Sequence, residues 1–258
     1  MAIHRFFVEA ELPVGAALHV SLALSESDLH HLAGVLRLGP GDLVTVVGPD
    51  GREAEATLRV VSPGEVVADL GAPVRPARRP RVALAAALSR RERWELALQK
   101  TTELGVSEVL PFLASRCVVR LDAGRSRTRT ERWRRIAQEA AKQSQRSDVP
   151  RVHDPLSFER LVDEVRRFDV AVVAWEEAAP GSPGIGQALD AAAAGRGASA
   201  LVVIGPEGGL TSGEVERLVA AGGVVVTLGD TVLRTETASI VAVALAIYES
   251  GGLGGRGD

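Results

Sequence analysis

The chain has 258 residues, a formal net charge of −3 and 46% hydrophobic residues, a composition typical of one or two globular domains. Residues 1–7 lack the apolar core and cleavage site of a signal peptide, and no run approaches the roughly 20 apolar residues of a membrane span. The single cysteine, Cys117, excludes an internal disulfide and a multi-cysteine metal site. We therefore expect a cytoplasmic protein with no membrane contact and no metal.

Residues 1–72 are expected to form a small β-rich domain. Strand-like patterns lie at 4–8, 43–47, 54–60 and 65–70, and most of them are separated by Gly- and Pro-containing turns. A capped helix is expected to begin at Ser25 and to reach Leu36. Short strands with one helix favour a compact barrel. The proline-rich residues 73–80 show no periodicity and are expected to be a linker.

From residue 81 to 250, strand and helix patterns alternate. Strands are expected at 82–88, 109–113, 117–119, 170–175, 201–204 and 224–227. Helices are expected at 92–104, from 128 to Pro150, and at 158–165, 185–194 and 238–248. Such alternation predicts a mostly parallel sheet covered on both faces, followed by a glycine-rich tail at 251–258. The last helix is apolar all round, so we expect it to be buried on every side, in part within a homodimer interface.

The charged residues are unevenly distributed. Ten basic and four acidic residues lie from Arg120 to Arg151, whereas residues 154–258 hold seven basic and fifteen acidic ones. Clustered Arg in a mildly acidic chain indicates a local surface for a polyanion such as RNA. Solvated helix faces are an equally open alternative at this point.

Two loops stand out because each follows a β-branched strand pattern. The first, 204–211, has the sequence Ile-Gly-Pro-Glu-Gly-Gly-Leu-Thr, and the second covers 228–238. Ligands in α/β folds bind beyond the carboxyl ends of strands, so the two loops are expected to close on one small molecule. The first loop lacks the Gly-Lys-Ser/Thr of a phosphate loop and is no dinucleotide fingerprint. A purely structural glycine turn remains the alternative.

The second loop carries the candidate chemistry. Arg234 at a helix start is a candidate for stabilising developing negative charge, and the alternative is a salt bridge to a nearby carboxylate. Thr235 or Thr237 is expected to cap the helix. Trp175 and Glu176 end another strand on the same side as both loops. The sequence leaves open whether they pack in the core or contact the ligand. The adjacent His30 and His31 point in different directions on a helix and have no third ligand nearby, which disfavours a metal site.

Four segments together resemble a known family. They are Ile204-Gly-Pro-Glu-Gly-Gly-Leu-Thr, Leu228-Gly-x-x-x-Leu-Arg-Thr-Glu-Thr-Ala, Gln138-Glu-Ala-Ala-Lys-Gln-Ser-x-Arg with Val149-Pro150, and His31-Leu-x-x-Val-Leu-Arg with Gly41-Asp42. In this order, over nearly the whole chain, they resemble the 16S ribosomal RNA uridine-N3 methyltransferases, the RsmE family of the SPOUT superfamily.

The resemblance implies the fold and the ligands. It implies an N-terminal PUA-like RNA-binding barrel and a C-terminal α/β SPOUT domain with a deep trefoil knot. It implies a homodimer through that domain, S-adenosylmethionine as cofactor, and 16S ribosomal RNA or the assembled small ribosomal subunit as partner. The residues that would bind the cofactor are Ile204, Gly205, Pro206, Glu207, Gly208, Gly209, Leu228, Gly229, Leu233, Thr235, Thr237 and Ala238.

The implied reaction is methylation of N3 of one uridine. Because uracil N3 carries a proton, we expect Arg234 to stabilise the developing anion and Glu236 to act as a base or positioning group. The candidates for RNA backbone contact are Arg5, Arg37, Arg116, Arg120, Lys142 and Arg146. Two alternatives remain open, a SPOUT enzyme that methylates a ribose 2′-hydroxyl in another RNA and a non-catalytic RNA-binding adaptor.

Overall fold

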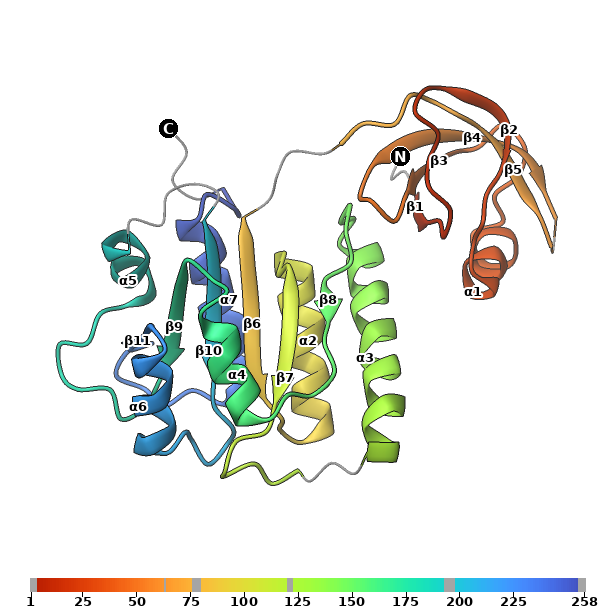
Figure 1. The fold of residues 1–258 in the computed structure, drawn as a ribbon. Coiled ribbons are helices and arrows are strands. Elements are labelled where there is room, and N and C mark those ends of the chain that lie inside the picture. Colours follow the sequence, from red (N-terminus) through yellow and green to blue (C-terminus); the bar gives the residue numbers. More distant parts are fainter. Residues whose placement is uncertain (1–3, 63, 76–79, 120–122, 193–197, 255–258) are drawn as a thin grey trace. The chain divides into compact units, whose positions relative to one another are not determined.

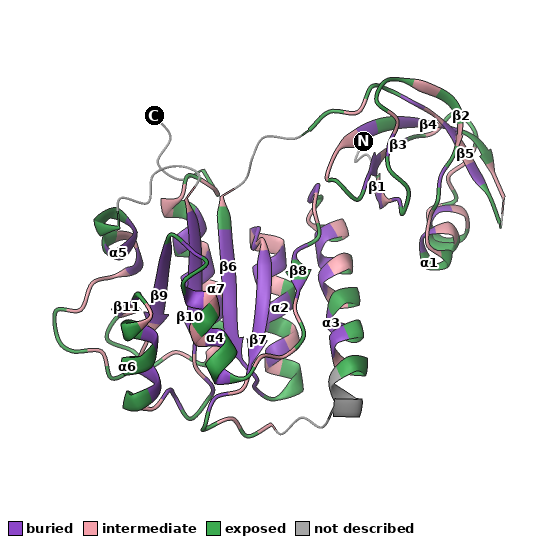
Figure 2. Cartoon of the chain, in the orientation of Figure 1, coloured by how far each residue is buried: buried purple, intermediate pink, exposed green. Residues whose placement is uncertain are grey.

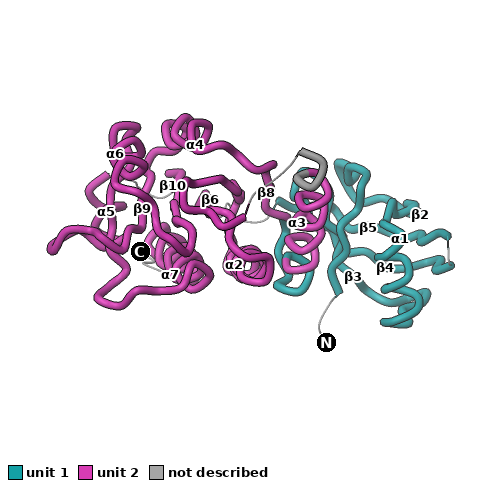
Figure 3. Tube along the Cα trace, turned by 90° about the horizontal axis from the view of Figure 1, so that it is seen from below, with its two compact units in different colours: residues 1–78, 141–148 teal, residues 79–140, 149–258 magenta. Residues whose placement is uncertain are grey.

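The structure is a computed structural model that describes residues 4–62, 64–75, 80–119, 123–192 and 198–254 (Figure 1). The chain divides into two compact units (Figure 3). Unit 1 comprises Met1–Arg78 and Ala141–Asp148, and unit 2 comprises Arg79–Ala140 and Val149–Asp258. The short segment 141–148, which we expected in the second domain, is therefore grouped with the first.

Unit 1 is built on a five-stranded sheet. In sheet order its strands are β1 (His4–Phe7), β3 (Leu43–Val47), β4 (Glu53–Val61), β5 (Val66–Leu70) and β2 (Ala17–Ser21). Only β1 and β3 are parallel, and the other neighbours are antiparallel. Beyond the two outer strands, the Glu9 N–H donates to the Ala23 carbonyl at 2.9 Å, so the sheet curls round its core. Fully buried members of that core include Leu32, Val44, Val46, Ala56, Leu58 and Ala68.

The helix of unit 1 begins as predicted but continues differently. The Ser25 hydroxyl accepts a hydrogen bond from the Asp28 N–H at 3.1 Å and caps α1 (Glu26–His30). The chain then widens into a π-helical turn, η1 (His31–Val35), and Arg37 takes a left-handed conformation with φ 54°. The prediction of one regular α-helix to Leu36 is therefore wrong in its second half.

Unit 2 contains a six-stranded, all-parallel sheet. In sheet order its strands are β11 (Gly223–Val226), β9 (Val170–Ala174), β10 (Ser199–Ile204), β6 (Arg81–Ala87), β7 (Glu108–Phe112) and β8 (Arg151–Val152). The central strands are buried along almost their full length, which explains their continuous apolar runs (Figure 2).

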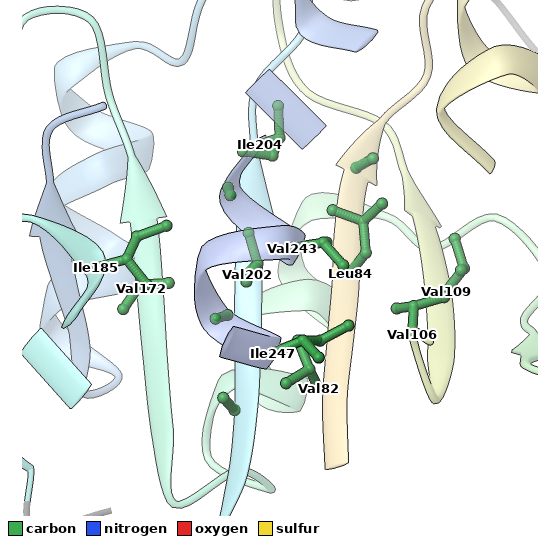
Figure 4. Packing of buried hydrophobic residues seen from close by; sticks show 14 of the residues in the cluster. Val82, Leu84, Val106, Val109, Val172, Ile185, Val202, Ile204, Val243 and Ile247 are labelled. Atoms are coloured by element: carbon green, nitrogen blue, oxygen red, sulfur yellow. The ribbon is translucent and has the colours of Figure 1, made fainter. Parts of the chain in front are cut away.

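Helices cover both faces of this sheet. The cluster on one face joins α2 (Arg91–Leu104), α3 (Ala123–Gln143), α5 (Ile185–Ala191) and α7 (Thr235–Glu249) to alternate strand residues such as Leu84 and Val202 (Figure 4). The cluster on the other face joins α4 (Phe158–Val165) and α6 (Ser212–Ala220) to the intervening residues, among them Ala85 and Val203. Because successive side chains of a strand point to opposite faces of the sheet, each central strand contributes residues to both hydrophobic clusters. The predicted α/β fold class is confirmed, and the trefoil knot stays a prediction.

Several predicted elements differ from the structure. Residues 117–119 form no strand, because the chain turns at Ser115 and Arg116 instead of pairing. Helix α3 begins five residues before the expected cap at Thr128 and ends at Gln143, well before Pro150. Strands β2 and β8 were not expected. In the single chain α7 leaves Leu245 and Tyr248 41% and 44% exposed, so its burial on every side stays a prediction that depends on the homodimer.

Candidate functional site

A pocket of about 320 Å³ lies at the carboxyl ends of β9, β10 and β11 in unit 2. The loops after β10 and β11 both line it, and so does the first turn of α7. Because β9, β10 and β11 are parallel, their carboxyl ends meet at one edge of the sheet, where α/β folds bind ligands. The predicted convergence of the two loops is therefore present.

Glycine is required in the first loop at two positions. Gly209 has φ +70°, a left-handed conformation that side chains rarely adopt. A Cβ on Gly205 would lie 3.1 Å from the Leu210 backbone nitrogen, which cannot move away without reshaping the loop. The loop therefore presents backbone rather than side chains to the pocket at Gly205.

A buried carboxylate fixes the end of this loop. Glu214 of α6 is 5% exposed and accepts hydrogen bonds from both the backbone N–H and the hydroxyl of Thr211, at 2.8 and 3.0 Å. It also accepts from the backbone N–H and hydroxyl of Ser115, at 2.8 and 3.0 Å. Burial raises the pKa of the Glu214 carboxyl, but these donors more than offset that effect and hold the pKa below its ordinary value.

Two further contacts brace the first loop from neighbouring segments. The Arg116 guanidinium donates to the Gly208 carbonyl at 3.0 Å. The Trp175 indole N–H donates to the Leu210 carbonyl at 3.3 Å, and Trp175 also lines the pocket. Trp175 thus packs against the hydrophobic cluster on one face of the sheet and also lies in the pocket wall, and a ligand contact stays a prediction. Glu176 also lines the pocket and lies against Gly209.

The start of α7 places two charged side chains. Arg234 is the N-cap residue, lines the pocket and is exposed. No carboxylate pairs with it in the described part of the chain, so the salt-bridge alternative is not seen. Neither threonine caps the helix, contrary to prediction, because the cap position falls one residue earlier. Glu236 is 9% exposed, and its carboxylate lies 4.0 Å from Arg93 Nε.

Most of the predicted cofactor-binding and catalytic residues line the pocket. Those in its wall are Ile204, Gly205, Pro206, Glu207, Leu228, Gly229, Leu233, Arg234, Thr235 and Ala238. The wall does not include Gly208, Gly209, Glu236 or Thr237. Sequence reasoning missed Arg93, Ala174 and Thr227 in the wall, whereas Asp230, Thr231 and Val232 belong to the predicted second loop but were not named as cofactor contacts. The position of Arg93 in the wall follows only from the strand order, since β6 lies beside β10 and the next helix, α2, begins at the same edge of the sheet.

The predicted RNA-contact residues fall into two groups. Arg37 and Arg116 are exposed, and no carboxylate among the described residues pairs with either. The other three described candidates belong to unit 1 and hold carboxylates, Arg5 with Glu53 at 2.8 Å, Lys142 with Asp28 at 2.5 Å, and Arg146 with Asp148 at 2.8 Å. Arg120 lies outside the described residues.

Burial separates these three paired cations further. The side chains of Arg5 and Lys142 are 15% and 14% exposed, and that of Arg146 is 1% exposed. A phosphate contact needs an accessible guanidinium, so Arg146 is corrected to a structural residue of segment 141–148.

Among the residues described, no group of three or more His, Cys, Asp or Glu side chains is arranged to hold a metal.

Comparison with known proteins is consistent over the whole chain. The family described as RNA methyltransferase domain matches residues 76–247, and the one described as RNA methyltransferase PUA domain matches residues 24–70. Ribosomal RNA small subunit methyltransferase E of Bacillus subtilis is 38% identical over 246 residues, which cover 92% of this chain and 93% of that protein. The protein of the same name from Mycobacterium tuberculosis is 38% identical over 221 residues, 83% of this chain and 80% of its own.

Solved structures give the same result. Ribosomal RNA small subunit methyltransferase E from Neisseria gonorrhoeae, bound to S-adenosyl methionine, has a TM-score of 0.80 at 27% identity and covers 95% of this chain and 96% of its own. A putative methyltransferase from Legionella pneumophila in complex with the same cofactor has a TM-score of 0.79 at 26% identity, over 95% and 97% of the two chains. The chain therefore belongs to the ribosomal RNA small subunit methyltransferase E family.

Proposed function

We propose that this protein transfers the methyl group of S-adenosylmethionine to N3 of a uridine in 16S ribosomal RNA. The observation that carries the proposal is the pocket at the carboxyl edge of the unit 2 sheet, with the unpaired Arg234 in its wall. Family membership supports it, because the relatives at 38% identity are named ribosomal RNA small subunit methyltransferases. Family membership also favours this proposal over the two alternatives, an enzyme that methylates another RNA target and a non-catalytic RNA-binding adaptor.

The pocket suits S-adenosylmethionine. Its volume of about 320 Å³ falls at the lower end of small-molecule sites, roughly 300–1,000 Å³. Three acidic side chains in the wall, Glu176, Glu207 and Asp230, favour a cationic sulfonium. The backbones of Gly205 and Gly229 leave room for the ligand, and Gly208, Gly209 and Thr237 remain proposed contacts. When bound, the cofactor would supply an electrophilic methyl group on sulfur.

Arg234 and Glu236 provide the chemistry at the uracil. The Glu236 carboxylate accepts the proton from N3, and the Arg234 guanidinium interacts with the uracil oxygens as negative charge develops. Bound S-adenosylmethionine would supply the methyl group to N3, with its sulfur as the leaving group. The Glu236 carboxylate lies 4.0 Å from Arg93 Nε, beside the start of α2.

The RNA substrate has to present an unpaired base. A uracil inside a duplex hides N3 in its base pair, so the target is a single-stranded or flipped nucleotide. Arg37 and Arg116 are exposed and suited to contact the RNA backbone. Arg5, Lys142 and Arg120 remain weaker candidates, the first two because they already hold carboxylates. The substrate is either free 16S ribosomal RNA or the assembled small subunit.

The homodimer is supported by one face of α7. Val241, Leu245 and Tyr248 recur at helical spacing on that face, and each remains partly exposed in the single chain. A second copy would cover them.

Among the residues described, none of the helices combines the length and apolar character that a bilayer span needs. Action on ribosomal RNA fits a cytoplasmic location, and a trefoil knot in unit 2 is part of the proposal.

The experiment uses purified protein, S-adenosylmethionine with a deuterated methyl group, and two RNA substrates. These are deproteinised 16S ribosomal RNA and assembled small subunits, both from cells that lack the modification. Nuclease digestion and mass spectrometry should find labelled N3-methyluridine. Labelled 2′-O-methylnucleoside would instead support another SPOUT activity. Absence of both transfer and cofactor binding would support the adaptor.

A further inference from the structure

Arg93 lies between the two carboxylates that the pocket loops bring together. Its Nη1 is 3.5 Å from Glu207 Oε1 in the loop after β10, and its Nε is 4.0 Å from Glu236 Oε1 at the start of α7. The Arg90 backbone N–H, at the N-cap of α2, donates to the same Glu207 oxygen at 3.3 Å. Glu207 is therefore held by the N-terminus of α2 and by Arg93 together.

These three side chains are largely withdrawn from water. The side chains of Glu207 and Glu236 are 21% and 11% exposed, and that of Arg93 is 34% exposed. In the described part of the chain, Arg93 makes the only ion pair of either glutamate. Among the described residues, the Arg93 guanidinium is therefore the cation that links the two carboxylates.

The backbone that carries Arg93 is firmly anchored. The next residue, Trp94, is 3% exposed and packs on Trp133 with ring centroids 5.1 Å apart. Ala97 and Leu98, one turn further along α2, are also buried, and α2 packs against α7. Glu207, by contrast, lies in a loop and Glu236 at a helix terminus. The anchored backbone is therefore that of Arg93, and its branched guanidinium lies within 4.0 Å of both carboxylates.

We propose that Arg93 is a positioning residue for methyl transfer. It is anchored by Glu207 on one side and holds the Glu236 carboxylate in the orientation from which it accepts the N3 proton. This inference rests on the proposed function, since it assigns Arg93 a role through Glu236. It also implies that the cluster of charged side chains between α2, the first loop and α7 is part of the active site. None of the family motifs in the two loops contains Arg93.

The first test separates the rate of transfer from cofactor binding. Arg93→Ala and Arg93→Met remove the charge, and the methionine keeps the packing volume of the arginine stem. Each should slow single-turnover methyl transfer by about 100-fold, the effect of a slightly misplaced catalytic group. The dissociation constant of S-adenosylhomocysteine, measured by calorimetry, should change by far less than the transfer rate, although Arg93 lines the pocket and holds Glu207. Arg93→Lys, which keeps the charge, should recover part of the rate.

The matched control is Arg91→Ala. Arg91 is on the same helix, is 66% exposed and pairs with Glu95 at 3.0 Å, away from the pocket wall. Its loss should leave the transfer rate unchanged. A combined variant tests the route of action, because Arg93→Met should cause little further loss in a Glu236→Gln background if Arg93 acts through Glu236.

Three results would overturn the inference. They are a wild-type rate in Arg93→Met, a loss of cofactor affinity as large as the loss of rate, and fully additive losses in the combined variant. If Arg93→Ala fails to fold, Arg93→Met carries the same test. Failure of the proposed function is distinguishable, since the wild-type protein itself would then form no N3-methyluridine.

Discussion

The Glu214 carboxylate accepts two hydrogen bonds from Ser115, a residue 99 positions earlier in the chain. Ser115 follows β7 and Glu214 lies in the first turn of α6, so the contact joins the segments after two different strands of the unit 2 sheet. The same carboxylate holds Thr211 at the end of the first pocket loop. One buried side chain thus fixes the loop that contributes Gly205 and Glu207 to the pocket.

Glu214→Gln should destabilise the protein and weaken cofactor binding. Each Glu214 oxygen accepts an N–H and a hydroxyl. An amide offers one oxygen, and its NH₂ group would face a backbone N–H. Leaving such buried groups unsatisfied costs about 1–3 kcal/mol. Denaturant unfolding and calorimetry with S-adenosylhomocysteine would measure both effects. Glu216→Gln, an exposed change on the same helix, is the control. Equal stability of the two variants would contradict the account.

The stability supplied by Glu214 should depend on pH. Its pKa is lowered in the folded protein, so the stabilisation is fully present above the unfolded value of about 4.3. It is lost as the pH falls through the lower folded pKa. The difference in unfolding free energy between wild type and Glu214→Gln should therefore be constant near neutrality and should shrink in acid below that range. A difference that grows in acid would exclude this role.

Arg234→Ala should separate binding from chemistry. Removal of a group that stabilises developing charge lowers the rate by about 100-fold or more, whereas the cofactor should still bind because most of the pocket wall is untouched. Single-turnover transfer and calorimetry with S-adenosylhomocysteine measure the two quantities. Loss of cofactor affinity together with the rate would make Arg234 a cofactor-binding residue instead of a catalytic one.

Arg37→Ala should weaken RNA binding in a salt-dependent way. Arg37 is exposed and unpaired among the residues described, and one phosphate contact contributes a slope of about −0.9 to the logarithmic salt dependence of affinity. Filter binding across a salt series should show that slope reduced by about one. Arg59, which pairs with Asp69 at 2.6 Å, provides the control variant Arg59→Ala. An unchanged slope in Arg37→Ala would remove Arg37 from the RNA surface.

Leu245→Glu should convert a dimer into a monomer. Leu245 is 41% exposed on the partly apolar face of α7, and a charge in an apolar interface is strongly unfavourable. Light scattering after size exclusion should give the mass of two chains for wild type and of one chain for the variant. Val219→Glu, at an equally exposed apolar position on α6, should leave the mass unchanged. A monomeric wild type would refute the homodimer.

Local patterns were sufficient to predict much of the fold. The continuous apolar runs of β6 and β10 and the two glycine-containing loops are properties of short segments. Tertiary contacts decided the rest. Segment 141–148 joins unit 1 through Lys142 and Asp28, which are 114 positions apart, and no local pattern encodes that pairing.

The functional site likewise has parts that local sequence predicts and parts that depend on tertiary contacts. The loops were predicted from their glycines and apolar residues, because backbone shape depends on the residues themselves. Arg93 could not be predicted, since its place in the pocket depends on β6 lying beside β10. The burial of Arg146 could not be predicted either, because a basic run does not show which of its members will face a carboxylate.

The most direct test of the central claim is the nucleoside content of ribosomal RNA in cells. Small-subunit RNA from a strain that lacks the gene would be digested and analysed by mass spectrometry, with and without the gene restored. The account predicts that N3-methyluridine is absent from the deletion strain and returns on complementation. Undiminished N3-methyluridine in the deletion strain, with loss of a different methylated nucleoside, would contradict it.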